Sequence, residues 1–363
     1  MHSTPDLTVT RPKPSQPGVP RWTRWIATKG SFKRIALLMS ILLLGLLVLG
    51  WYVMWMPGTS FRGELPPATP GQLETAERLH ADVVHMASGI GVRSTYNAKE
   101  LAQTALDLKA RLAAMGHTPV DHSFPARGAA SPNIEIEIKG SDPACASQIV
   151  LIGAHYDSYH GTPGADDNAS GVAAILELAR RARDWKPQRT IRLVLFVNEE
   201  PPAFMTGDMG SLIYARKARE QGDNIIAMMS LECIGYYKTA LGTQEYPWPL
   251  GSFYPTTADF VAIVGDLASR SLVHRVIGSF RLHAQFPSEG AAAPQRIPGI
   301  GWSDHWSFWQ CGYQAVMVTG TAPFRNPNYH DSTDTPETLD YDRMARVIDG
   351  LEKVVIDLAN NGR

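Results

Sequence analysis

The stretch IVLIGAHYDSYHGTPGADDNASGVAAILELA, residues 149 to 179, decides the fold because it runs from an apolar strand through a polar loop into a helix. Residues 149 to 152 are all apolar, as in a strand covered on both faces. Residues 155 to 171 then hold two histidines, three aspartates, an asparagine and three glycines. A solvated acidic turn would explain residues 166 to 168 alone. The preceding His155 and Asp157 favour a bound cation, because a carboxylate at a buried strand end is costly without one.

Short β-type runs alternate with amphipathic helical runs along the rest of the chain. We expect strands over residues 134–139, 149–155, 190–197, 225–231 and 315–319. We expect helices over residues 72–86, 98–115, 171–185, 210–220, 258–270 and 336–360, the second behind a capping-box pair of Asn97 and Glu100. Such alternation predicts an α/β fold: a three-layer sandwich with a mostly parallel mixed sheet and helices on both faces.

The amino-terminal region differs from the rest in composition. Residues 1–34 are proline-rich, polar and basic, which predicts a disordered tail. Residues 35–56 carry no charge, and about 22 residues at 1.5 Å each cross a bilayer core of about 30 Å, so we expect one transmembrane helix in contact with the lipid bilayer. Basic residues precede this segment, which predicts a cytoplasmic amino terminus and an extracytoplasmic domain. A cleaved signal peptide is the alternative.

Residues 57–70 form a proline-rich linker, which leaves residues 71–363 for the soluble domain. The 363-residue chain is 44% hydrophobic and 19% charged, which is enough apolar sequence to form a large core. Its net charge of −1 does not favour binding to nucleic acid. Three cysteines permit at most one disulfide, and the sequence does not choose a pair among Cys145, Cys233 and Cys311. The oligomeric state stays open.

Potential metal ligands stand at the ends of several predicted strands. His155, Glu199, Glu200 and Glu232 close or follow three of them, and the loop after residue 319 leads to His330. Sites in a largely parallel sheet gather at the carboxyl ends of the strands, so we expect these side chains to meet. Each one alone would be an ordinary solvated strand end or loop residue. Together they predict a functional site.

Histidine and carboxylate ligands without thiolate are typical of zinc or another divalent first-row ion. Two ions fit if one carboxylate bridges them, and Asp167 is placed for this. Asp157 lies two residues after His155 and is placed to accept the second ring N–H of that ligand. The predicted metal ligands are His155, Asp167, Glu200, Glu232 and His330.

The motifs HYDS, GADDNASGVAA, NEE, SLECIGY, SDHWSFWQCGY and YHDSTDTPETLD resemble, in order and spacing, the M28 family of zinc exopeptidases of the aminopeptidase Y and S type. The resemblance covers about residues 75 to 360. It implies two Zn²⁺ ions bridged by Asp167, one completed by His155 and Glu232 and the other by Glu200 and His330. It also implies that Glu199 is the general base. Many members have aspartate where Glu232 stands.

The reaction that follows is zinc-dependent hydrolysis of the peptide bond at the free amino terminus of peptides, through a metal-bridged water and the base Glu199. The resemblance leaves two alternatives, which are acyl transfer of the glutaminyl cyclase type with one zinc and a non-catalytic, receptor-like ectodomain. The sequence has no G-x-S-x-G elbow and no HExxH motif. The segment 241–301 either walls the substrate pocket or is a structural excursion.

Overall fold

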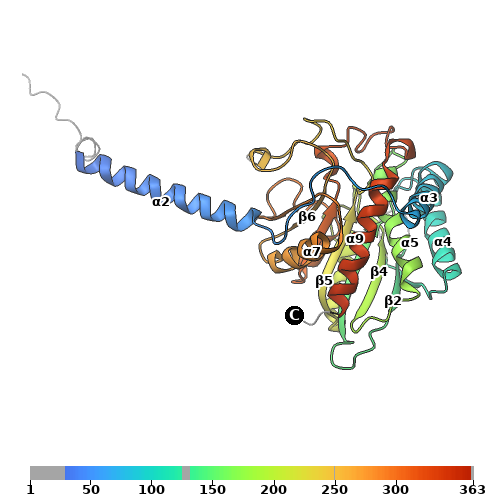
Figure 1. Cartoon of the computed structure of the whole chain (residues 1–363). Coiled ribbons are helices and arrows are strands. Elements are labelled where there is room, and N and C mark those ends of the chain that lie inside the picture. The colour runs from blue at the N-terminus through green and yellow to red at the C-terminus, as the bar shows by residue number, and fades with distance from the viewer. Residues whose placement is uncertain (1–28, 125–130, 249, 361–363) are drawn as a thin grey trace, which may run out of the picture. The chain divides into compact units, whose positions relative to one another are not determined.

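The computed structural model of the protein describes residues 29–124, 131–248 and 250–360 (Figure 1). The chain divides into two compact units, Met1–Tyr52 and Val53–Arg363, which are described separately. The first unit contains most of helix α2, Lys29–Met54. The segment Phe32–Met54 of this helix has a mean hydropathy of 2.4 and is long and apolar enough to cross a membrane, a property that signal sequences share.

The ends of this helix differ from the prediction. Residues 29–34, expected in the tail, form the start of α2 because no proline follows Pro20 until the helix has ended. Residues 1–28 of the predicted tail lie outside the described residues. At the other end, Val53 and Met56 are buried in cores of the second unit, so the last residues of the predicted span belong to that unit.

The second unit is built on one sheet of eight strands in the order β1-β2-β4-β3-β5-β8-β6-β7. The pairs β3–β4, β3–β5, β5–β8 and β6–β7 are parallel, and β1–β2, β2–β4 and β6–β8 are antiparallel. The mostly parallel mixed sheet is therefore confirmed. The strands are β1 Val120–His122, β2 Asn133–Ile138, β3 Gln148–His155, β4 Thr190–Phe196, β5 Asn224–Glu232, β6 Val261–Gly265, β7 Ser288–Ala292 and β8 Ala315–Thr319.

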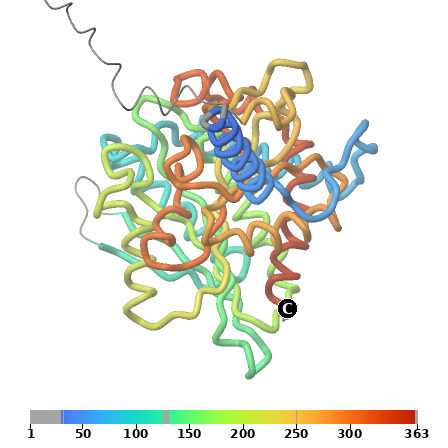
Figure 2. The backbone as a smooth tube through the Cα atoms, turned by 90° about the vertical axis from the view of Figure 1, so that its left-hand side faces the viewer, coloured from blue at the N-terminus to red at the C-terminus, as the bar shows by residue number. Residues whose placement is uncertain are grey.

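Helices cover both faces of the sheet (Figure 1). In β3, Val150 and Ile152 join a core formed with α3, α4, α5, α7 and α9, whereas Ile149 and Leu151 face a second core with α6 and α8. This alternation buries both faces and explains the continuously apolar strand. Helix α9 packs on α3 and α7, and its red backbone can be followed in Figure 2. The helices are α3 Pro70–Val84, α4 Ala98–Ala114, α5 Gly171–Ala182, α6 Gly210–Gln221, α7 Arg270–His283, α8 His305–Gln310 and α9 Tyr341–Asn360.

The predicted helix over 258–270 is wrong. Its apolar residues form strand β6, which pairs with β8 and β7, and α7 begins only at Arg270. A short apolar run fits both a strand and a buried helix turn, and the cross-strand pairing settles the choice here. The predicted helix over 336–360 also starts later, at Tyr341, after a 3₁₀ turn at Pro336–Thr338.

The predicted capping box at Asn97 is also wrong. The Asn97 side chain accepts a hydrogen bond from the Ser94 hydroxyl at 2.8 Å and does not cap α4. A capping box does form at α3, where the Thr69 hydroxyl accepts from Gln72 N and the Gln72 side chain accepts from Thr69 N.

The proline-rich segment 57–70 belongs to the second unit and is hydrogen-bonded to the rest of it. Arg281 Nη1 donates to the Pro57 carbonyl at 3.1 Å, and Arg346 Nη2 donates to the Pro66 carbonyl at 2.7 Å. Proline carbonyls without a ladder partner are ready acceptors for such side chains. The compact unit therefore includes residues that the sequence assigns to a linker. All three cysteines lie in the described part of the chain and are free.

Candidate metal centre

Four neighbouring strands, β4, β3, β5 and β8, bring the predicted ligands to one edge of the sheet. His155 ends β3, Glu232 ends β5, and Glu200 follows β4. Asp167 comes from the turn before α5, and His330 comes from the loop after β8. The chain reaches Asp167 through Gly164, whose φ of 60° and close contact with the Asp167 carbonyl leave no room for a Cβ atom. All five predicted ligands are thus brought together.

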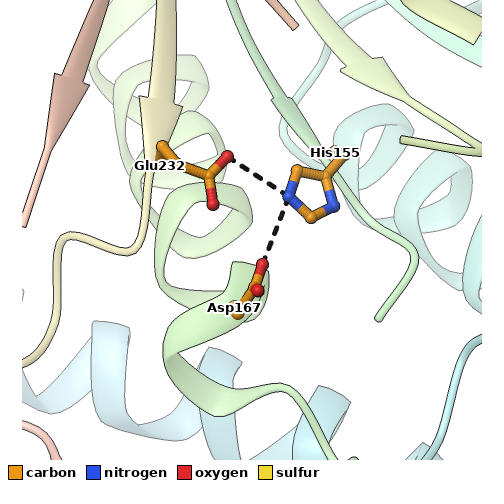
Figure 3. A group of neighbouring side chains, drawn as sticks. All are labelled: His155, Asp167 and Glu232. Carbon is orange, nitrogen blue, oxygen red and sulfur yellow. Dashed lines mark ion pairs between the residues drawn. The ribbon is translucent and has the colours of Figure 1, made fainter. Parts of the chain in front are cut away.

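The ligand atoms form two groups that share Asp167. In the first, Nε2 of His155 lies 3.3 Å from Asp167 Oδ1 and 3.3 Å from Glu232 Oε2 (Figure 3). In the second, Nε2 of His330 lies 3.1 Å from Asp167 Oδ2 and 3.4 Å from Glu200 Oε2. Each oxygen of Asp167 therefore faces a different histidine, as a bridging ligand requires.

Several of these atoms are buried without a hydrogen-bond partner in the described structure. They are His155 Nε2, Asp167 Oδ1, Glu200 Oε1 and His330 Nε2. Buried polar atoms nearly always have a hydrogen-bond partner. A cluster of imidazole nitrogens and carboxylate oxygens without such partners therefore indicates a bound cation. Imidazole and carboxylate donors suit zinc, and each group offers three protein ligands, the number typical of a catalytic zinc site. The residues therefore fit two ions.

The charge balance of the cluster also favours a cation. Burial and the neighbouring charge of Asp167 raise the pKa of Glu200 to about 8. Burial lowers the pKa of His330, but its contacts with Asp167 and Glu200 outweigh this and raise it to about 10. Burial raises the pKa of Glu199 well above its usual value, and the charges of Glu200 and Glu232 add to this. Four buried carboxyl groups, those of Asp167, Glu199, Glu200 and Glu232, thus lie close to two imidazoles, and a bound cation would favour their ionised forms.

Asp157 contacts the site in a different way from the prediction. Nδ1 of His155 lies 3.1 Å from the backbone oxygen of Asp157 and 3.7 Å from its carboxylate, so the backbone oxygen is the nearer acceptor. The Asp157 carboxylate instead accepts the backbone N–H groups of Glu199 at 3.2 Å and Glu200 at 3.0 Å. Asp157 therefore holds the turn that carries both glutamates.

The two adjacent glutamates point to different parts of the site. Strand β4 ends at Phe196, and Asn198 has a φ of 58°, so the chain turns before the pair instead of at the prolines that follow it. Oε2 of Glu199 lies 4.0 Å from Nε2 of His155, beside the first group, whereas Glu200 belongs to the second group. Their unlike positions are consistent with unlike roles.

Two supporting residues are missing from the sequence-based prediction. The Asp334 carboxylate accepts the backbone N–H groups of Asp166 at 2.9 Å and Asp167 at 3.1 Å. Asp334 could have been found from the sequence, because it lies in the YHDSTDT motif that also contains His330. Arg93 is completely buried, and its guanidinium donates to backbone carbonyls around the same loop, namely those of Met86, Gly91, Tyr156, Pro163 and Gly164. No pattern in its neighbourhood marks it.

A pocket opens beside the metal centre, next to Glu232 and Tyr329, and encloses about 780 Å³ including solvent at its mouth. Residues 246 to 302 supply much of its lining, so the segment 241–301 does wall a pocket. Of the two interpretations of this segment, the pocket wall and the structural excursion, the lining favours the pocket wall.

Comparison with known proteins identifies the family. Residues 133–355 match Peptidase family M28. The chain belongs to this family. It is 36% identical to the uncharacterized protein YfbL of Escherichia coli over 293 residues, which cover 78% of this chain and 87% of YfbL. It is 28% identical to leucine aminopeptidase 1 of Arthroderma otae over 65% of this chain and 57% of that protein.

Solved structures share the fold. The LapA aminopeptidase of Legionella pneumophila superposes with a TM-score of 0.64 at 21% identity, covering 83% of this chain and 78% of that one. A glutaminyl cyclase of Bacteroides thetaiotaomicron superposes with a TM-score of 0.59 at 19% identity, covering 81% and 99%. The M28 family confirms the predicted enzyme class, a zinc-dependent hydrolase of the aminopeptidase type. The fold alone does not separate it from the cyclase.

Proposed function

We propose that the protein removes residues from the free amino terminus of peptides, with two zinc ions. His155, Asp167 and Glu232 hold one ion, and Asp167, Glu200 and His330 hold the other. The observation that carries this proposal is the division of the Asp167 carboxylate, whose two oxygens face His155 and His330 separately. A site for a single ion gives no reason for the second complete group.

Zinc held by these residues would lower the pKa of the attacking water and polarise the scissile carbonyl. Glu199 accepts the proton of that water and delivers it to the leaving amine, the task of a general base. Its backbone and that of Glu200 are fixed by Asp157, so the base keeps its place beside the ligands. Asp157 thus orients the catalytic turn and supports His155 through its carbonyl.

Two alternatives stay in the proposal. Acyl transfer of the cyclase type fits the shared fold, but the complete set of five ligands favours hydrolysis with two ions. A receptor-like ectodomain that has lost its metals is disfavoured because every ligand and Glu199 are present and close together.

The test compares aminoacyl anilides with free and with acetylated amino termini, together with a glutaminyl peptide, on the purified full-length chain supplied with zinc. Hydrolysis of free amino termini only is the expected result. Cleavage of the acetylated substrates would show that the site does not require a free amine, and release of a cyclised product from the glutaminyl peptide would favour the cyclase. No bound zinc would favour the receptor.

We further propose that residues 35–52 anchor the chain in the membrane as a single pass, with a cytoplasmic amino terminus and an extracytoplasmic catalytic domain. This span is shorter than the predicted 35–56 because Val53 and Met56 are buried in the second unit. The apolar helix supports the span. The basic residues before it support the orientation. The substrates are then peptides outside the cytoplasm.

A further inference from the structure

The floor of the pocket beside the metal centre is a row of paired residues across four strands. Glu232 pairs with Thr319, Thr319 pairs with Ala262, and Ala262 pairs with Glu289. All four residues line the pocket. Three strand spacings of about 4.8 Å separate the two ends, so the backbones of Glu232 and Glu289 lie about 14 Å apart. The row places a carboxylate at each end and two small side chains between them.

The residues that surround this row are mostly apolar. The next row of the floor is formed by Met317, Val264 and Ala291, and helix α7 covers the opposite face of the same strands. Aromatic residues form much of the walls, and Trp302 and Phe324 are stacked with ring centroids 6.4 Å apart. A leucine side chain held at the Glu232 end is too short to reach Glu289 across these strands.

Glu289 is the charged group at the far end of this pocket. No lysine, arginine or histidine lines the pocket within the described residues. Nη2 of Arg281 lies 4.0 Å from the Glu289 carboxylate, but this arginine donates its hydrogen bonds to Ser288 and Pro57. The cationic neighbours of the Glu289 carboxylate are Arg281 and Arg62, and its side chain is 23% exposed. A partly buried carboxylate whose paired guanidinium is 4.0 Å away keeps oxygen lone pairs for the cationic end of a ligand.

We infer that this pocket selects peptides whose amino-terminal residue is arginine or lysine, with Glu289 binding the charged end of that side chain. The inference rests on the proposed aminopeptidase function, since the α-amine is then held at the Glu232 end. Long basic side chains combine an apolar stem, which suits the row over Thr319 and Ala262, with a cationic end. A guanidinium also stacks on aromatic walls and pairs with a carboxylate through two N–H groups.

The test compares hydrolysis of arginine, citrulline and leucine anilides by the full-length chain with zinc. Citrulline has the shape of arginine without its charge. We expect kcat/KM for arginine to exceed that for citrulline by about tenfold or more, the discrimination of one charged hydrogen bond. Equal values for these two substrates in the wild-type enzyme, with leucine hydrolysed, would overturn the inference and leave the proposed function intact. Hydrolysis of none of the three would contradict the proposed function and the inference together.

The Glu289→Gln variant then assigns the preference to this residue. We expect its arginine-to-citrulline ratio to fall to about one while leucine hydrolysis is retained. Glu245→Gln is the matched control, because Glu245 is exposed on the segment that walls the pocket but does not line it. A ratio that is unchanged in Glu289→Gln, or lowered equally in Glu245→Gln, would overturn the assignment.

Discussion

The carboxylate of Asp334 holds the backbone of Asp167, since Oδ2 of Asp334 accepts the Asp167 N–H at 3.1 Å. Its other oxygen accepts the N–H of Asp166 at 2.9 Å, so both acceptors are used. Asp334 is fully buried and lies on the same loop as His330. The proposed bridging ligand is therefore positioned by a residue that has no metal contact of its own in the two ligand groups.

Replacing Asp334 with asparagine turns one acceptor into an N–H₂ group facing a backbone N–H. We expect zinc affinity to fall by about 10- to 100-fold, as is usual when a residue supporting a ligand is changed. Zinc competition with a chromogenic chelator measures this. Asp331→Asn serves as the control because Asp331 is exposed on the same loop. Wild-type zinc affinity in Asp334→Asn would show that the contact with Asp167 does not position the ligand.

Substitutions of Glu199 and Glu200 test whether the first is the general base and the second a zinc ligand. Glu199→Gln keeps the shape of the side chain and removes the base, so we expect normal zinc content with turnover lower by about 10²- to 10⁴-fold. Glu200→Gln weakens a ligand, so we expect less bound zinc and partial rescue of activity by excess zinc. Zinc content and turnover of both purified variants decide this. Zinc loss in Glu199→Gln and not in Glu200→Gln would reverse the assignments.

Low pH should remove the stability that the buried carboxylate of Glu177 contributes to the fold. Glu177 lies between Arg78 and Arg181. Burial raises the pKa of Glu177, but the two arginines outweigh this and lower it to about 2. The unfolded value is about 4.3, so the stabilisation is complete above that pH and is lost as the pH falls towards 2. We expect Glu177→Gln to cost about 2 kcal/mol at pH 7 and much less near pH 2.5.

Melting temperatures of the wild type and of Glu177→Gln at both pH values measure this difference. Glu220→Gln, an exposed residue on α6, should change neither. A Glu177→Gln penalty that is as large at pH 2.5 as at pH 7 would show that the carboxylate charge is not its source.

The membrane orientation is tested with a reporter that is active only outside the cytoplasm, fused after residue 70. We expect activity, because basic residues precede the apolar helix. An expressed but inactive fusion would reverse the orientation. A truncation to release the domain should start at Val53, since Val53 and Met56 are buried in its cores.

The grouping of the five candidate ligands was predictable from the sequence, because apolar runs mark the strand ends and the parallel strands bring those ends together. It did not predict β6, whose short apolar run becomes a strand only through pairing with β8. It also did not predict Arg93, because its partners are backbone carbonyls that any sequence supplies. The sequence placed Asp157 beside His155, but it could not show that the backbone oxygen of Asp157 lies nearer to Nδ1 than its carboxylate does.

Asp167 belongs to both ligand groups, and we propose that its carboxylate binds a zinc ion in each. The most direct test of this proposal is the zinc content of the purified chain after saturation and removal of free metal, measured for the wild type and for Asp167→Asn. We expect two zinc ions per wild-type chain, one for each ligand group, and loss of zinc from both groups in Asp167→Asn. One zinc per wild-type chain, or two zinc ions retained in Asp167→Asn, would contradict the proposal.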